Sequence, residues 1–230
     1  MTPPRRLFLS KKILVVTAHA DDETLGCGGT LLKHRANGDA VSWIISTAPS
    51  EPKYDSSFIS QWNKQIDSVA QAFGMEKVYR IGLPVTKLDT LPESDIINSI
   101  GEAIAHAKPD IVYIVHPGDS HADHRIVYSA AIVGLKPFVY GHAIDIYCFE
   151  TISSTNVAMP LPGPVFEPQH YCDISSYMDA KLDILKHYKT EIKEPPHPRS
   201  AEAVRALARF RGSSIFVDYA EAFSVIRTVK

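Results

Sequence analysis

The chain has 230 residues, of which 45% are hydrophobic and 22% charged, and its formal net charge is −2. These values fit a soluble α/β domain and give no sign of a nucleic-acid surface or of a membrane span. Three widely spaced cysteines without a CxxC pair argue against a disulfide scaffold. Because the apolar stretch near the N-terminus is too short for a signal sequence, we expect a cytoplasmic protein.

Five segments have the nearly continuous apolar and β-branched character of strands that are buried on both faces of a sheet. These expected strands cover residues 12–18, 40–47, 77–82, 110–116 and 143–150. Helical patterns lie between them, at residues 24–36, 58–73, 94–107 and 124–134. The alternation predicts an α/β fold: a doubly wound, mostly parallel sheet with helices on both faces.

The C-terminal third is less regular. Residues 155–170 are rich in proline, which predicts an irregular insertion over the sheet. Beyond them we expect a helix at 176–192, a turn at 194–200, a helix at 201–212 and a partial strand at 219–228. Since no flexible hydrophilic linker separates these segments, residues 1–230 are predicted to form a single domain.

Two groups of histidines and acids follow the first and the fourth expected strands. The first group is His19, Asp21, Asp22 and Glu23, and the second is His116, Asp119, His121, Asp123 and His124. In the common doubly wound order these two strands are neighbours, and ligands bind beyond their C-terminal ends. We therefore expect the two groups to surround one cavity and to hold a cation there.

The ligand types narrow the choice of cation. Two imidazoles and one carboxylate suit Zn²⁺ with three protein ligands and one open position, although Fe²⁺, Co²⁺ and Mn²⁺ are also compatible. His19 and Asp22 are three residues apart, so they share one side of a first helical turn, and His124 can complete the set. Asp21 adjoins a ligand and is placed to take a proton from water whose pKa the metal lowers to about 7.

The remaining polar residues of the two groups have open roles. His121 can act as an acid or stabilise an oxyanion, whereas Asp119 and Asp123 either fix the tautomer of a histidine or form turns. Glu23 is expected to be a first-turn acid that favours the helix dipole. His197, in the proline-rich turn, is a tentative substrate contact.

Two further features have structural interpretations. The glycines in "GCGGT" (26–30) do not match a dinucleotide fingerprint, so we expect them to let the first helix approach the sheet closely. Trp43 and Trp62 are expected to be core and helix-packing residues.

The segments "AHADDE" (18–23) and "HPGDSHADHR" (116–125) resemble the two motifs of the PIG-L/LmbE-like N-acetyl-sugar deacetylases. A weaker likeness extends over 83–92, 196–200 and 206–223. The resemblance implies a Rossmann-like fold and Zn²⁺-dependent hydrolysis of an N-acetyl amide, with an N-acetylglucosamine derivative or another glycoconjugate as the small-molecule substrate. It implies zinc on His19, Asp22 and His124, and Asp21 as the general base. The same resemblance implies that His121 stabilises the oxyanion or acts as an acid. It also implies that Asp123 adjusts the acidity of His121.

The sequence also departs from the family pattern. Ala20 stands where the first motif usually has proline, and the expected helix at 58–73 lacks the arginine that many members use to hold a sugar. Two alternatives to an N-acetyl-sugar deacetylase therefore stay open. One is a hydrolase of another acyl amide or an ester, and the other is a non-catalytic metal- or sugar-binding module. A homo-oligomer is compatible with either.

Overall fold

A seven-stranded sheet organises the residues that the computed structural model describes, 10–158 and 163–229. Its order is β3-β2-β1-β4-β5-β7-β6; the first five of these strands are parallel, and β7 is antiparallel to both of its neighbours. The strands are β1 (Lys12–Thr17), β2 (Ala40–Ala48), β3 (Lys77–Pro84), β4 (Ile111–Val115), β5 (Asp145–Phe149), β6 (His170–Asp173) and β7 (Ala220–Arg227). The predicted doubly wound, mostly parallel sheet is confirmed.

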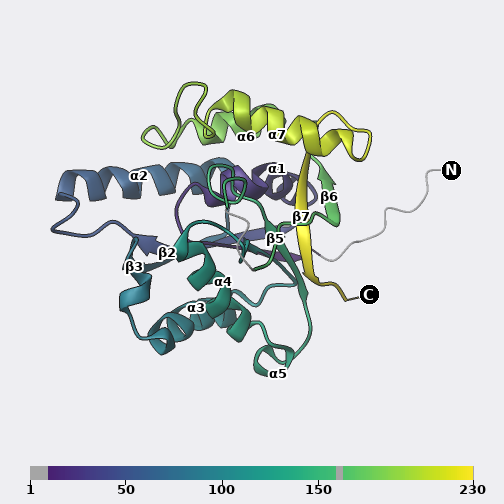
Figure 1. Cartoon of the computed structure of the whole chain (residues 1–230). Helices are drawn as coiled ribbons and strands as arrows, with labels where there is room; N and C mark the ends of the chain where they lie inside the picture. The colour runs from purple at the N-terminus through teal and green to yellow at the C-terminus, as the bar shows by residue number, and fades with distance from the viewer. Residues whose placement is uncertain (1–9, 159–162, 230) are drawn as a thin grey trace.

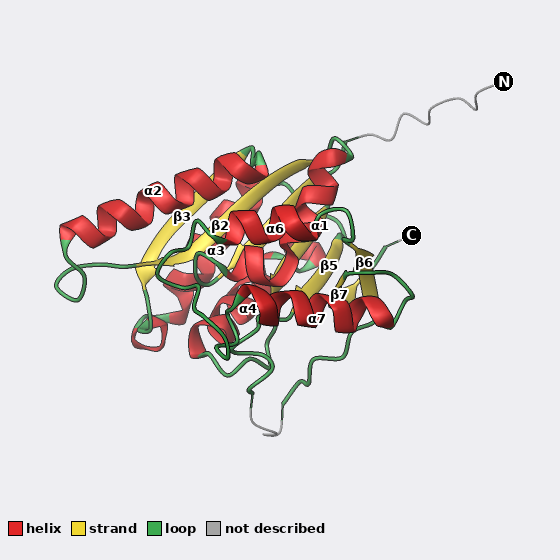
Figure 2. Cartoon of the chain, turned by 90° about the horizontal axis from the view of Figure 1, so that it is seen from above, coloured by secondary structure: helices red, strands yellow, loops and turns green. Residues whose placement is uncertain are grey.

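Helices cover both faces of this sheet, as Figure 1 shows: α1, α2, α6 and α7 lie on one side and α3, α4 and α5 on the other. Their bounds are α1 (Asp22–Ala36), α2 (Ser56–Phe73), α3 (Glu93–Ala107), α4 (Ala122–Gly134), α5 (Pro137–Tyr140), α6 (Met178–Leu185) and α7 (Ala201–Ser213), with a 3₁₀ turn at Leu88–Thr90. Seen from above in Figure 2, α1 and α6 lie side by side over the sheet, in agreement with their contacts. Among the described residues, no helix combines the length and the apolar character needed to cross a bilayer.

Several elements differ from the sequence expectations, and two of them lie in the C-terminal third. The helix expected at 176–192 ends at Leu185, and tight turns follow in which Tyr188 N–H donates to the carbonyl of Leu185. This early end lets the Tyr188 hydroxyl reach the buried carboxylate of Glu23. Strand β6 was not predicted, because its four residues are too few for a recognisable pattern and follow a proline-rich segment. Of the irregular insertion expected at 155–170, residues 159–162 lie outside the described residues.

Helix α1 packs very closely on the sheet, as the sequence analysis expected from its glycines. A Cβ atom on Gly26 would lie 2.1 Å from Cδ2 of Phe149, a fully buried residue of β5. A Cβ atom on Gly29 would lie 2.7 Å from Cβ of Ile174. The close approach holds the N-terminal end of α1, and with it the first histidine–acid group, against the end of the sheet.

Replacing Gly26 by alanine is expected to lower the free energy of unfolding by roughly 1–3 kcal/mol, since the added methyl group must displace the Phe149 ring. Denaturant unfolding of the purified protein measures this change. Gly101→Ala in α3 is the matched control, because a Cβ atom there meets nothing within 4 Å. The control should leave stability unchanged or raise it by up to about 1 kcal/mol. Equal effects of the two substitutions would contradict the close packing of α1.

Candidate metal centre and active site

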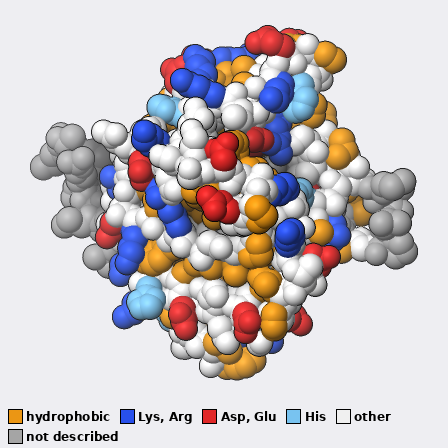
Figure 3. Space-filling model, turned by 90° about the vertical axis from the view of Figure 1, so that its left-hand side faces the viewer, with side chains coloured by type: hydrophobic (Ala, Val, Ile, Leu, Met, Phe, Trp, Pro, Cys, Tyr) orange, Lys and Arg blue, Asp and Glu red, His pale blue; other side chains and the backbone are white. Residues whose placement is uncertain are grey.

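The two histidine–acid groups meet beyond the C-terminal ends of β1 and β4. These strands pair in parallel, with Val16 opposite Ile114, so the loops that follow them emerge side by side. The face at which the parallel strands end is turned to the viewer in Figure 3, where acidic and hydrophobic side chains gather around its centre. The predicted convergence of the two groups at the switch point of the sheet therefore occurs.

One ring nitrogen each of His19 and His124 and the two carboxylate oxygens of Asp22 lie within a few ångströms of one another. Nδ1 of His19 is 3.2 Å from Nε2 of His124, which in turn is 3.3 Å from Oδ1 of Asp22. Nδ1 of His19 is 3.7 Å from Oδ2 of Asp22. Ligands bound to Zn²⁺ in a tetrahedron are separated by about 3.3–3.5 Å, so these residues fit a zinc ion with little adjustment.

A carboxylate lies close to the far nitrogen of both His19 and His124, within hydrogen-bond geometry at His19 and as an ion-pair contact at His124. Oδ2 of Asp123 lies 3.0 Å from Nε2 of His19 and also accepts the backbone N–H of Thr86 at 2.8 Å. Oδ2 of Asp119 lies 3.0 Å from Nδ1 of His124. Such carboxylates fix the ring orientation and the tautomer of metal-binding histidines. The sequence analysis assigned Asp123 to His121, whereas the structure places the Asp123 carboxylate on His19.

The charges in this cluster outweigh the effect of burial on its ionisation. Although burial disfavours a cation, the carboxylates of Asp22 and Asp119 raise the pKa of His124 to about 10. Although burial also disfavours an anion, His124 and His19 lower the pKa of Asp22. Metals bind neutral histidine, so binding here would release the proton that these carboxylates hold on His124.

His121 gives the structure a second possible ligand set. One donor atom from each of His19, His121 and His124 lies within 4.8 Å of the other two. The structure therefore offers two candidate ligand sets, and the distances among His19, Asp22 and His124 are close to those in tetrahedral zinc sites.

Asp21 occupies a strained backbone position at the start of α1, with a φ of 131°. Two partners hold it there: Oε2 of Glu23 accepts the backbone N–H of Asp21 at 3.1 Å, and Nη1 of Arg199 donates to Oδ2 of Asp21 at 2.9 Å. Burial raises the pKa of the Asp21 carboxyl well above its usual value, and the Arg199 guanidinium opposes that shift. Strain of this kind is concentrated at functional sites, where surrounding contacts stabilise it.

Glu23 has a different role from the one expected. It was predicted to be a first-turn acid acting on the helix dipole, but it is fully buried and its Oε1 accepts hydrogen bonds from the Tyr188 and Thr24 hydroxyls. Burial raises the pKa of Glu23 to about 7. The residue links the turn after α6 to the backbone of Asp21, so it supports the position of that carboxylate.

His121 stands at the N-terminal end of α4 and lines the same cavity as Asp21. Its Nδ1 accepts the backbone N–H of Asp123 at 3.2 Å, so the neutral ring carries its proton on Nε2. Burial lowers the pKa of His121, and the nearby rings of His19 and His124 add to this shift. At neutral pH the ring is therefore a hydrogen-bond donor without a full positive charge.

A cavity of about 220 Å³ opens beside these residues. Its described lining consists of His19, Ala20, Asp21, Thr47, Ala48, Pro49, Tyr54, Phe58, Trp62, Val85, His121, Glu191 and Arg199. Trp62, which was expected to be a helix-packing residue, thus forms part of the cavity wall. His197 is exposed, and its Nδ1 accepts the backbone N–H of Arg199 at 3.1 Å. Its contact with a substrate stays a prediction.

Sequence reasoning did not predict two contacts between residues that are far apart in the chain. Arg199 and Tyr188 are 178 and 165 residues away from their partners Asp21 and Glu23, respectively. Pairings across such separations leave no periodic pattern in one sequence. The only signal for Arg199 was its place in a rigid proline turn, next to His197.

The comparisons with known proteins agree with this geometry. The family model described as PIG-L: GlcNAc-PI de-N-acetylase matches residues 14–133, which is more than half of the chain. The chain is 27% identical to the uncharacterized deacetylase YaiS of Escherichia coli (strain K12) over 187 residues, covering 78% of this chain and 91% of YaiS. It is 22% identical to the diacetylchitobiose deacetylase of Thermococcus kodakarensis over 228 residues, covering 94% and 83%, respectively.

A solved structure extends the likeness to the fold. The N,N'-diacetylchitobiose deacetylase of Pyrococcus horikoshii, in complex with its inhibitor MPG, superimposes with a TM-score of 0.75 at 22% identity. The match covers 94% of this chain and 84% of that one. Both motifs that converge at the candidate metal centre lie inside the matched family region. The chain belongs to the PIG-L family of deacetylases.

Proposed function

We propose that this protein is a metal-dependent hydrolase that removes the acetyl group from an N-acetylated amino sugar, with an N-acetylglucosamine derivative as the first candidate. One observation carries the proposal. Donor atoms of His19, Asp22 and His124 stand 3.2–3.7 Å apart, and the buried carboxylate of Asp21 lines the adjacent cavity. Zn²⁺ is the proposed ion.

A divalent ion bound by these three residues would polarise the acyl oxygen and lower the pKa of a water molecule. Asp21 accepts the proton from this water, and its burial favours the protonated form that results. Arg199 keeps the Asp21 carboxylate aimed at the cavity through the 2.9 Å hydrogen bond to Oδ2. The same proton can then pass from Asp21 to the nitrogen of the breaking amide.

His121 completes the arrangement at the acyl carbon. Its Nε2–H can donate to the oxygen that gains negative charge when water adds to the amide, as oxyanion-stabilising groups do. The C–N bond then breaks, and the products are acetate and the free amine. In this assignment Asp123 acts indirectly, through its contacts with His19 and with the His121 ring.

The two alternative functions from the sequence analysis differ in which residues of the site they would need. A non-catalytic binding module has no need for a strained, buried Asp21 held by Arg199 and Glu23. A hydrolase of another acyl amide or of an ester would use the same residues and differ only in the group that the cavity accepts.

Release of acetate from a panel of substrates tests the proposal. The zinc-loaded protein would be incubated with N-acetylated amino sugars, with N-acylated sugars bearing longer acyl chains, and with acetate esters. We expect acetate from the N-acetyl sugars at the highest kcat/KM. Turnover restricted to the longer amides or the esters would favour the second alternative. A zinc-loaded protein that releases nothing from any of them would favour the binding module.

A further inference from the structure

One side of the cavity is formed by an aromatic wall, which we define as Tyr54, Phe58 and Trp62. Phe58 and Trp62 are four residues apart in α2 and therefore share one face of that helix. Tyr54 precedes the helix and stacks on Phe58, with ring centroids 4.9 Å apart and an interplanar angle of 23°. All three residues are half-buried and line the cavity, so their rings are available to a ligand.

The aromatic wall and the reactive groups belong to the same cavity. His19, Asp21 and His121 line it together with the three aromatic residues, and its volume is about 220 Å³. A substrate with its acetamide at the metal centre would therefore extend toward α2. Flat apolar groups bind aromatic rings by stacking, in addition to the gain from burying their surface.

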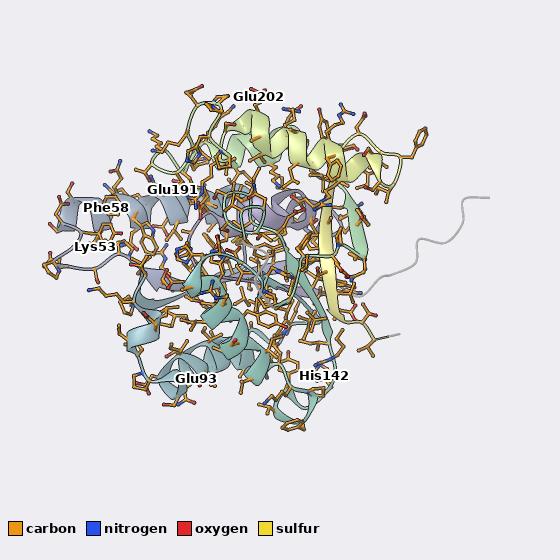
Figure 4. The ribbon with its side chains drawn as sticks, in the orientation of Figure 1. Lys53, Phe58, Glu93, His142, Glu191 and Glu202 are labelled. Carbon is orange, nitrogen blue, oxygen red and sulfur yellow. The ribbon has the colours of Figure 1, made fainter. Side chains whose placement is uncertain are left out.

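The charges around the cavity disfavour an anionic substituent there. Among the described residues that line the cavity, Arg199 is the only one that carries a permanent positive charge. Its Nη1 donates to Asp21 at 2.9 Å and to Glu191 at 2.6 Å, so two carboxylates already neutralise it. Figure 4 shows Glu191 and Phe58 on the same side of the molecule.

A lysine does lie close to the aromatic wall. Nζ of Lys53 is 5.2 Å from the centre of the Tyr54 ring, and the figure labels this residue on the loop before α2. Lys53 is exposed and is not part of the described lining of the cavity. Its charge is therefore hydrated and screened, in contrast to the enclosed ion pairs of Arg199.

We propose that the acceptor of the acetyl group carries an uncharged, flat apolar substituent, such as an aryl group, that stacks on the aromatic wall. A phosphate group at that position is the anionic substituent that the cavity disfavours. This inference rests on the proposed function and adds the class of substrate. The residues that set the preference are Phe58 and Trp62, on the helix that lacks the arginine expected from the family pattern.

Product binding and turnover test this inference together. Isothermal titration of the zinc-loaded protein would compare phenyl glucosaminide, glucosamine and glucosamine 1-phosphate, which are the deacetylated forms of three matched substrates. We expect the phenyl compound to bind roughly tenfold more tightly than glucosamine, and the phosphate no more tightly than glucosamine. The kcat/KM values of the three N-acetyl compounds should follow the same order.

Two substitutions identify the source of the preference. Phe58→Ala and Trp62→Ala should each reduce the advantage of the phenyl compound to about threefold or less. Trp62 packs partly against the core, so Phe58→Ala serves as the variant with the smaller risk of unfolding. Phe138→Ala is the matched control, because this phenylalanine is 83% exposed on α5 and is not part of the cavity.

Tighter binding of the phosphate than of glucosamine would overturn the inference. It would also be overturned by a phenyl advantage that both wall variants retain, or by the absence of any such advantage in the unaltered protein. Failure of all three N-acetyl compounds to release acetate would refute the proposed function instead. In that event the binding series still decides whether the wall selects an apolar group.

Discussion

Asparagine in place of Asp21 is expected to lower kcat for deacetylation by about 10²–10⁴-fold, the contribution of a general base. The amide cannot accept a proton from water, yet it has the same shape and can still accept the hydrogen bond from Arg199. Asparagine also tolerates positive φ better than most residues, so the backbone at 131° should persist. The zinc content should match that of the unaltered protein, since Asp21 is not one of the assigned ligands.

Acetate release under saturating substrate, together with elemental analysis of the same sample, measures both parts of this prediction. Asp183→Asn is a control for the loss of one carboxylate: Asp183 is exposed on α6, where it pairs with Lys186. It should leave kcat unchanged. If Asp21→Asn kept more than about a tenth of the original kcat, the assignment of the general base would be wrong.

The sequence was sufficient for the five parallel strands and for the meeting of the two histidine–acid groups. Buried parallel strands have a near-continuous apolar character, and the common doubly wound order predicts that the first and the fourth strands are neighbours. Once β1 and β4 are adjacent, His19, Asp22 and His124 must emerge at the same end of the sheet. The local sequence and the doubly wound strand order are therefore enough to predict that these three residues lie close together.

The sequence did not predict the contacts that orient the acidic side chains of the site. Arg199 reaches Asp21 from the turn before α7, and Tyr188 reaches Glu23 because α6 ends early. Trp62 lies on a helix with a large apolar face, and the sequence does not distinguish the part that packs on the core from the part that lines the cavity. These contacts depend on how α2, α6 and α7 are placed over the sheet, and the sequence of one segment alone does not predict that placement.

Replacing His124 by alanine is expected to remove bound zinc. In the proposed ligand set His124 supplies one of three donor atoms, so the loss in affinity should exceed the 10–100-fold that removal of a supporting hydrogen bond typically costs. Asp119→Asn should give a loss within that smaller range, because the Asp119 carboxylate is not a proposed ligand but lies 3.0 Å from Nδ1 of His124. The same carboxylate also accepts hydrogen bonds from the Ser154 and Thr155 hydroxyls, which an asparagine oxygen can still accept. Competition with a chelator of known affinity, followed by elemental analysis after dialysis, would rank the two variants.

His121→Ala distinguishes between the two ligand sets that the structure offers. If zinc is bound by His19, Asp22 and His124, this variant should keep its zinc and lose turnover, since His121 then acts only on the substrate. Equal loss of zinc in His121→Ala and His124→Ala would instead place His121 among the ligands, as the cluster of three histidines within 4.8 Å allows. Full zinc occupancy in a folded His124→Ala protein would refute both sets, because His124 is common to them.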